Sequence, residues 1–151
     1  MATPHWLDPD EQHAWRVYLR MQSRLQRRLS QQLQRDSGLS DADFEVLVNL
    51  SEAEDGRLRA FELGDELQWE KSRLSHHLTR MERRSLVARE ECLTDARGAF
   101  VRITEQGRAS IEHAAPMHVA EVRARFIDVL SPAQLRALDE ICETVLAALE
   151  D

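Results

Sequence analysis

The sequence predicts a mainly α-helical protein with one small β-hairpin. Three observations support this fold class: aromatic residues make up only 5% of the 151 residues, glycine and proline are few, and apolar residues recur at helical spacing along several long segments. The hydrophobic share of 42% supports a core. No apolar run approaches the roughly 20 residues that span a bilayer, and the N-terminus lacks the pattern of a signal peptide. We therefore expect a cytoplasmic protein without membrane contact.

The N-terminal part is predicted to form a long helix over residues 9–35 and a shorter helix after it. Asp8 fits the N-cap of the long helix, and Gly38 fits its C-terminal cap. Ser40 begins the next helix with Asp43 three residues on, close to a capping box. The apolar positions of the long helix, at helical spacing, are Trp15, Tyr18, Leu19, Leu25, Leu29 and Leu33.

The central part is predicted to alternate short helices with a hairpin. In order, we expect a turn containing Asp-Gly at 51–57, a short helix at about 59–67, a helix at about 70–84, and strands at 86–93 and 99–104. Val101 and Ile103 alternate with Arg102, as in a half-buried strand. Gly98, in the predicted hairpin tip at 94–98, is free to adopt a positive φ.

The C-terminal part is predicted to form two further helices. The first covers 105–129 and contains Pro116, so we expect a kink or a break there. The last begins with Ser131 as N-cap and Pro132 at the first helical position. Its apolar stripe consists of Leu135, Leu138, Ile141, Val145, Leu146 and Leu149.

Charge is distributed unevenly along the chain. The net charge is −7, yet residues 71–102 hold eight Lys or Arg against four Asp or Glu, a local charge of +4 that leaves −11 elsewhere. On the helix at 70–84, Leu74, Leu78 and Met81 fall on one stripe and face the preceding helix. The opposite face carries Ser72, Arg73, His76, Thr79, Arg80 and Arg83. This face is either a solvated surface or a DNA-reading helix that enters the major groove.

The predicted hairpin favours the DNA-reading interpretation. Arg97 stands at its tip beside Gly98, where a single arginine can enter the minor groove, and Asp95 is placed to orient that arginine. A short helix, a turn, a second helix and then a hairpin with Arg-Gly at its tip are together typical of a winged helix-turn-helix. An ordinary amphipathic helix predicts none of these features.

The segment "LGDELQWEKSRLSHHLTRMERRSLVAREECLTDARGAFVRITEQGR", residues 63–108, resembles MarR-family transcriptional regulators. "KSRLSHHLTRMERRSLVARE" is similar to the family's recognition helix and first wing strand. "TDARGAFVRITEQGR" is similar to its D-x-R-G wing and the threonine-x-x-glycine start of the next helix. The flanking helices are similar to the family's dimerisation arms. Where the family usually has glycine after the recognition helix, this chain has Ser85; if the backbone needs a positive φ there, serine costs about 1 kcal/mol.

The resemblance implies a two-fold homodimer that binds double-stranded DNA at a pseudo-palindromic operator, commonly as a repressor, and that often responds to small ligands or thiol oxidation. It divides the chain into N-terminal helices at 1–52, a winged helix-turn-helix lobe at 53–104 and C-terminal dimerisation helices at 105–151. Recognition-helix contacts would come from Ser72, Arg73, His76, Thr79 and Arg80, and wing contacts from Arg97 with Asp95 in support. We expect Lys71, Arg83 and Arg84 to attract phosphates without reading sequence.

A pocket for an effector is expected between the arms and the lobe, where Trp15, Tyr18, His113 and His118 are candidates to line it. For each of these residues, core packing or solvent exposure is an alternative. No cofactor is implied. No clustered Cys or His spacing indicates a metal site, and no G-x-S-x-G, H-E-x-x-H or Gly-rich phosphate loop indicates an enzyme.

Two other functions remain open at this point. A winged helix can serve as a protein-interaction module, although Arg73, Arg80 and Arg97 together suit DNA better. Cys92 could act as a thiol redox sensor, but the neighbouring glutamates disfavour a thiolate. The simpler expectation is that Cys92 and Cys142 are reduced, packed thiols.

Overall fold

The structure is a computed structural model, and it describes residues 1–91 and 98–150. The helices are α1 (Pro9–Ser37), α2 (Asp41–Glu52), α3 (Ala60–Leu67), α4 (Lys71–Arg83), α5 (Glu105–Arg125) and α6 (Pro132–Leu149), with short 3₁₀ turns at Glu54–Gly56 and Ile127–Val129. The strands are β1 (Arg57–Arg59), β2 (Val87–Glu90) and β3 (Phe100–Ile103). The mainly α-helical fold with a small antiparallel sheet is confirmed.

The chain divides into two compact units. The central unit covers Gln32–His118, and the terminal unit consists of Met1–Gln31 and the described residues from Val119 onward. Helices α1 and α5 each contribute residues to both units. This division follows compactness, whereas the boundaries predicted from the sequence divide the chain by role.

The helix starts follow the capping residues of the sequence. Asp8 Oδ1 accepts the backbone N–H of Glu11 at 2.8 Å, and the Glu11 carboxylate accepts that of Asp8 at 2.9 Å. Ser40 and Asp43 form the same reciprocal pair at the start of α2, as Ser131 does with its partner at the start of α6. Each pair satisfies backbone donors that a helix N-terminus leaves without partners.

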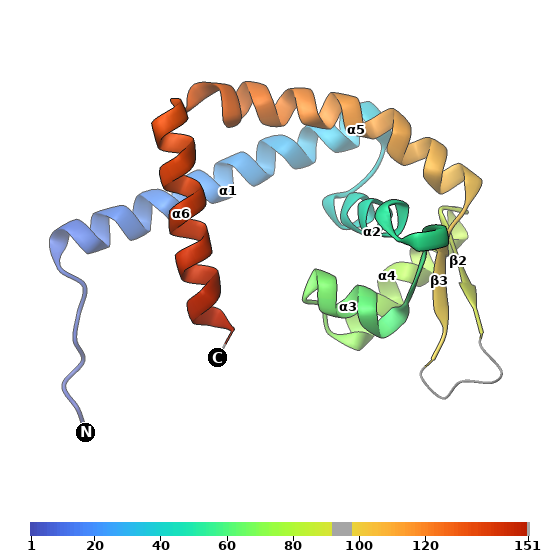
Figure 1. Cartoon of the computed structure of the whole chain (residues 1–151), viewed down its shortest axis with the longest axis horizontal. Helices are drawn as coiled ribbons and strands as arrows, with labels where there is room; N and C mark the ends of the chain where they lie inside the picture. The colour runs from blue at the N-terminus through green and yellow to red at the C-terminus, as the bar shows by residue number, and fades with distance from the viewer. Residues whose placement is uncertain (92–97, 151) are drawn as a thin grey trace. The chain divides into compact units, whose positions relative to one another are not determined.

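The sheet contains a strand that the sequence did not predict. Its order is β1-β3-β2, with Leu58 of β1 opposite Val101 of β3. Figure 1 shows β2 and β3 side by side. The Asp-Gly turn was predicted, and its Asp55 (φ 57°) and Gly56 (φ 65°) both adopt left-handed conformations. This turn sends residues 57–59 back along β3. Three residues are too few to show an alternating pattern, which is why the strand was missed.

The core of the central unit lies among α2, α3, α4 and the sheet. It consists of Leu39, Val46, Leu47, Leu50, Leu63, Leu74, Leu78, Met81, Leu86, Val87, Val101, Ile103, Ile111 and Ala114. The predicted inward stripe of α4 is confirmed, because Leu74, Leu78 and Met81 are each at most 3% exposed. Burial of these three side chains fixes which face of α4 meets solvent.

Of the kink or break expected at Pro116, the break is wrong, because α5 continues through this residue. The chain stays helical from Glu105 to Arg125 and passes into the 3₁₀ turn only after that. Proline removes one backbone donor, which leaves the carbonyl of Glu112 without its helical partner. Pro116 and Glu112 are both exposed, so water can hydrogen-bond that carbonyl and the helix continues.

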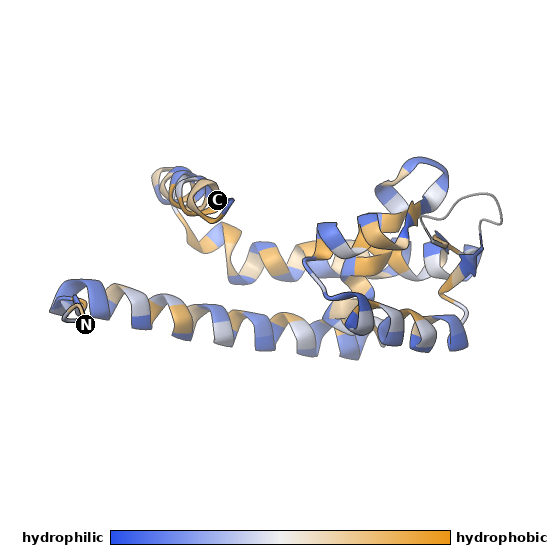
Figure 2. Ribbon diagram, turned by 90° about the horizontal axis from the view of Figure 1, so that it is seen from below, coloured by the Kyte–Doolittle hydropathy of each residue, from blue (hydrophilic) through white to orange (hydrophobic). Residues whose placement is uncertain are grey.

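The terminal unit buries very little of its apolar surface within one chain. Helix α6 has no buried residue, and Ile141, Val145 and Leu149 are 60%, 53% and 73% exposed. Figure 2 shows apolar residues recurring along both α1 and α6. Cys142 is an exposed free thiol, so the expectation that it is packed is wrong for the single chain. None of the described helices is both long and apolar enough to cross a membrane.

Candidate nucleic-acid interface

Helix α4 presents a polar, basic face to solvent. The exposed residues on it are Lys71, Ser72, Arg73, His76, Arg80 and Arg83. Thr79 is half-buried, and its hydroxyl donates to the carbonyl of Ser75 at 3.0 Å. The packing of α4 therefore turns outward six of the seven predicted DNA-contact residues that lie within this helix, with Thr79 at the edge.

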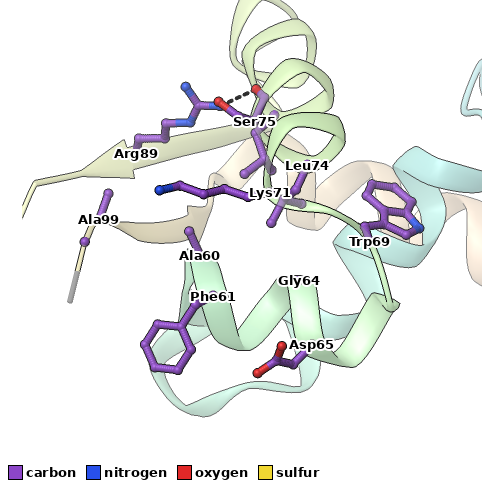
Figure 3. Close-up of a pocket in the computed structure, with 12 residues that line it drawn as sticks. Ala60, Phe61, Gly64, Asp65, Trp69, Lys71, Leu74, Ser75, Arg89 and Ala99 are labelled. Atoms are coloured by element: carbon purple, nitrogen blue, oxygen red, sulfur yellow. Dashed lines mark hydrogen bonds between the residues drawn. The ribbon is translucent and has the colours of Figure 1, made fainter.

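The first turn of α4 has free backbone donors. Its N-cap, Glu70, makes no side-chain capping hydrogen bond. A hollow of about 560 Å³ borders this turn, and Phe61, Lys71 and Ser75 are among the residues that line it (Figure 3). Arg89 of β2 donates to the backbone carbonyl of Ser75, which ties the wing to α4. Uncapped N–H groups at a helix N-terminus favour negative charge.

Two of the outward arginines have defined orientations. The Arg73 guanidinium lies over the Trp69 ring, 4.3 Å from its centroid. Arg80 Nη2 lies 3.1 Å from Nδ1 of His77, one turn earlier on the same helix. His77 is itself 8% exposed and meets Trp69 edge to face at 5.6 Å. Both arginines thus rest on a partly buried aromatic support.

Asp43 anchors this support from α2. The carboxylate is 2% exposed; its Oδ2 accepts from Arg84 Nη1 at 2.6 Å and from the Ser40 backbone at 3.0 Å. Burial raises the pKa of Asp43, but the close contact of His77 Nε2 and the hydrogen bonds from Ser40 and Arg84 outweigh it and hold that pKa far below its usual range. Arg84 also donates to the Gly38 carbonyl at 3.0 Å. Arg84 is therefore hydrogen-bonded within the fold, and its predicted attraction of phosphate stays a prediction.

The C-terminus of α4 closes on a left-handed serine. Ser85 has φ 62°, its N–H donates to the Glu82 carbonyl at 2.9 Å, and the N–H of Leu86 donates to the Met81 carbonyl at 3.1 Å. These two bonds form a Schellman motif, in which the left-handed position usually holds glycine. The condition stated for a cost at Ser85, a positive φ, is therefore met.

The wing carries two arginines that the sequence analysis missed. Arg57 and Arg59 of β1 lie against the Phe100 ring, 4.5 Å and 4.3 Å from its centroid. Their place on a strand depends on pairing with β3, and only the local "RLR" pattern hints at it. Gly98 has φ 92°, as expected, and open space around its α-carbon. Cys92, Asp95 and Arg97 lie outside the described residues.

The predicted effector residues fall in both units. Trp15 and Tyr18 stack at 5.8 Å in the terminal unit. In the central unit His113 is exposed, while His118 Nδ1 lies 3.1 Å from Oε1 of the buried Gln32, and burial lowers the pKa of His118. The pocket itself stays a prediction. Within the described part of the chain, no three His, Cys, Asp or Glu side chains gather so as to hold a metal ion.

Comparison with solved structures identifies the family. AbsC, a MarR family transcriptional regulator from Streptomyces coelicolor, is 44% identical, with 97% of this chain and 99% of AbsC covered and a TM-score of 0.92. The chain belongs to the MarR family. A sequence profile of that family matches residues 37–98.

Other MarR-family relatives support DNA binding. Sco3205 from Streptomyces coelicolor, whose crystal structure is a complex with DNA, is 38% identical over all of this chain and 94% of its own, with a TM-score of 0.94. The transcriptional regulator MhqR of Bacillus subtilis is 29% identical over 108 residues, which is 72% of each chain. The chain is accordingly a DNA-binding transcriptional regulator of the MarR family.

Proposed function

We propose that this regulator binds a pseudo-palindromic operator as a homodimer and represses transcription. The observation that carries the DNA contact is the division of α4 into a buried apolar stripe and an exposed basic face. A two-fold dimer would present two such helices to successive major grooves, so the operator repeats the protein's symmetry.

The polar residues of α4 would divide into two roles. Ser72, Arg73, His76, Thr79 and Arg80 would contact base edges, since arginine offers paired donors to guanine and hydroxyls add short polar contacts. Lys71 and Arg83, at the two ends of the helix, would contact phosphates. On the wing, Arg97 would enter the minor groove, with Asp95 and Gly98 shaping the turn that carries it.

The homodimer is supported by apolar surface that one chain leaves uncovered. Besides the stripe of α6, Trp6, Trp15 and Tyr18 are 79%, 53% and 47% exposed. Large contiguous apolar surfaces mark association sites in soluble proteins. We propose a second copy as the partner, because a dyad is what a pseudo-palindromic operator requires.

We also propose that a small ligand relieves repression. Such a ligand would favour a spacing of the two DNA-reading lobes that fits the grooves poorly, and it would work through its preference for that state. Trp15, Tyr18, His113 and His118 are the residues we propose to contact it.

The test is binding of the purified protein to its own upstream DNA at low and at physiological salt. Wild type should bind selectively, with an affinity that falls steeply as salt rises. An Arg73→Ala/Arg80→Ala variant should lose selective affinity by at least about 30-fold, since each of the two base contacts contributes roughly 1–3 kcal/mol.

An Arg73→Lys/Arg80→Lys variant is the matched control. It keeps both positive charges but loses the forked donors. We expect it to retain weak, salt-dependent binding to any DNA while losing selectivity. A folded wild-type dimer that selects no DNA at either salt would contradict the proposal and favour the protein-interaction alternative.

A further inference from the structure

His77 is the one histidine of α4 that points into the protein. It is 8% exposed, whereas its neighbour His76 lies on the solvent face. Both of its ring nitrogens meet charged side chains. Nε2 lies 2.9 Å from Asp43 Oδ1, at ion-pair distance though not in the geometry of a regular hydrogen bond, and Nδ1 lies 3.1 Å from Arg80 Nη2.

The chemistry of these neighbours selects one tautomer. A guanidinium can only donate hydrogen bonds, so the Nδ1 that faces Arg80 must be the acceptor and carry no proton. A neutral imidazole then has its proton on Nε2, which faces the carboxylate of Asp43. The two contacts therefore agree on a single arrangement, in which His77 donates toward Asp43 and accepts from Arg80.

The far end of this arrangement is rigid. Asp43 is 2% exposed and is held in place by the Ser40 backbone and by Arg84. Trp69 covers the His77 ring edge to face, which limits rotation of the imidazole. Arg80, by contrast, is exposed, and within the described residues no carboxylate pairs with it. An exposed arginine without such a support would sample many rotamers.

We propose that His77 is a positioning residue for DNA recognition. Its protonated Nε2 faces the fixed carboxylate of Asp43, and its unprotonated Nδ1 therefore accepts from the Arg80 guanidinium at a defined place. The hydrogen bond from Arg80 to Nδ1 restricts where this guanidinium can meet DNA before binding occurs. Pre-ordering a side chain removes part of the cost of ordering it in the complex. The inference rests on the proposed contact between Arg80 and DNA.

Two amide substitutions separate the two ring nitrogens. In His77→Asn the side-chain oxygen can take the place of Nδ1 and accept from Arg80. In His77→Gln the amide nitrogen can reach the place of Nε2 and donate to Asp43, but the acceptor beside Arg80 is lost. Both variants are neutral and polar, and thermal unfolding shows whether they are comparably folded.

The readout is affinity for the operator relative to unrelated DNA. We expect His77→Gln to lose about tenfold in selective affinity, the equivalent of one hydrogen bond, and His77→Asn to stay within about twofold of wild type. In an Arg80→Ala background, His77→Gln should have no further effect, because the two residues act as one.

Different failures have different meanings. If Arg80→Ala binds like wild type, the proposed contact of Arg80 fails and the inference falls with it. Two other outcomes overturn only the positioning role of His77. In the first, Arg80→Ala has a lower selective affinity for the operator but His77→Gln binds like wild type. In the second, His77→Gln and His77→Asn lose the same amount of selective affinity.

A further test measures the ¹⁵N chemical shifts of the His77 ring in the wild-type protein, so its result does not depend on whether any variant folds. Nδ1 of His77 should show the shift of an unprotonated nitrogen, and Nε2 that of a protonated one. A protonated Nδ1 would overturn the inference.

Discussion

Ser85 is a residue whose backbone conformation lowers the free energy of unfolding. The Schellman motif at the end of α4 requires a left-handed residue, and the φ of 62° is one that serine adopts with strain. Ser85 is exposed, so glycine would lose little packing. We expect Ser85→Gly to raise the free energy of unfolding by about 1 kcal/mol, measured by urea denaturation.

Gly38 allows the reverse substitution, from glycine to a residue with a β-carbon, at another left-handed position. It has φ 69°, and an added β-carbon would meet no atom within 4 Å, so an alanine there meets only backbone strain. Gly38→Ala should therefore lower the free energy of unfolding by about 1 kcal/mol. Equal effects of the same sign from the two substitutions would contradict the conformational explanation.

Asp43 links stability to pH. Because its folded-state pKa lies far below that of the unfolded chain, its contribution is fully present above the unfolded pKa of about 3.9 and is lost as the pH falls toward the folded value. Asp43→Asn should lower the free energy of unfolding at pH 7 by roughly 1–3 kcal/mol, since it removes the charged acceptor that Arg84 and His77 face, while the half-exposed Arg84 stays solvated. The variant's stability should also depend less on pH below 4 than that of wild type. Urea titrations at several pH values would measure both effects.

At the scale of elements, the sequence predicted those helices and strands that depend on residues close together in the chain, and it missed those that depend on distant residues. The starts of α1, α2 and α6 follow capping residues that lie within four positions of each other, and α4 follows its own apolar spacing. Strand β1 exists only because Leu58 pairs with Val101, more than 40 positions away, and nothing in three residues signals such a partner. The same holds for the site. The outward face of α4 was visible in its periodicity, whereas the roles of Arg84 and His77 depend on Asp43 of another helix.

The contact between α5 and the wing gives a prediction at this scale. Gly107, in the first turn of α5, lies so close to the Leu86 backbone that an added β-carbon would be 2.1 Å from its carbonyl oxygen. Thr104 caps this turn, with its hydroxyl accepting from the Gly107 N–H at 2.9 Å. Gly107→Ala should separate α5 from the wing and cost about 1–3 kcal/mol or more of unfolding free energy, measured by thermal denaturation.

Gly64 of α3 is the matched control, since it is also a helical glycine. A β-carbon there would lie 3.5 Å from Leu74 and from the Trp69 carbonyl, which is ordinary van der Waals contact. Gly64→Ala should be neutral or stabilise by up to about 1 kcal/mol, because alanine favours helices over glycine. A loss in both variants would show that helical glycine in general, and not the approach to Leu86, governs the result.

At the scale of the whole molecule, the two units differ in how much of their apolar surface they bury. The central unit has a closed apolar core and a basic outer helix, whereas α6 of the terminal unit has no buried residue. A helix so exposed gains little stability from packing within its own chain, although packing of an apolar face supplies most of the stability of helices in proteins. Its stripe is therefore the surface on which dimerisation, and through it operator recognition, is expected to depend.

Val145 lies on that stripe and is 53% exposed. In Val145→Glu a charge would be placed in the proposed interface, where an unpaired charge is costly to desolvate. We expect this variant to dissociate at micromolar concentration, whereas wild type should sediment at twice the 17.4 kDa of one chain. Ala147→Glu adds the same charge to the same helix away from the stripe and should stay dimeric.

A monomer that keeps an intact α4 should bind half of an operator weakly and lose selectivity for the full site, because the second helix no longer adds its contacts. Retention of full operator affinity by a monomeric Val145→Glu would show that recognition does not need the dyad.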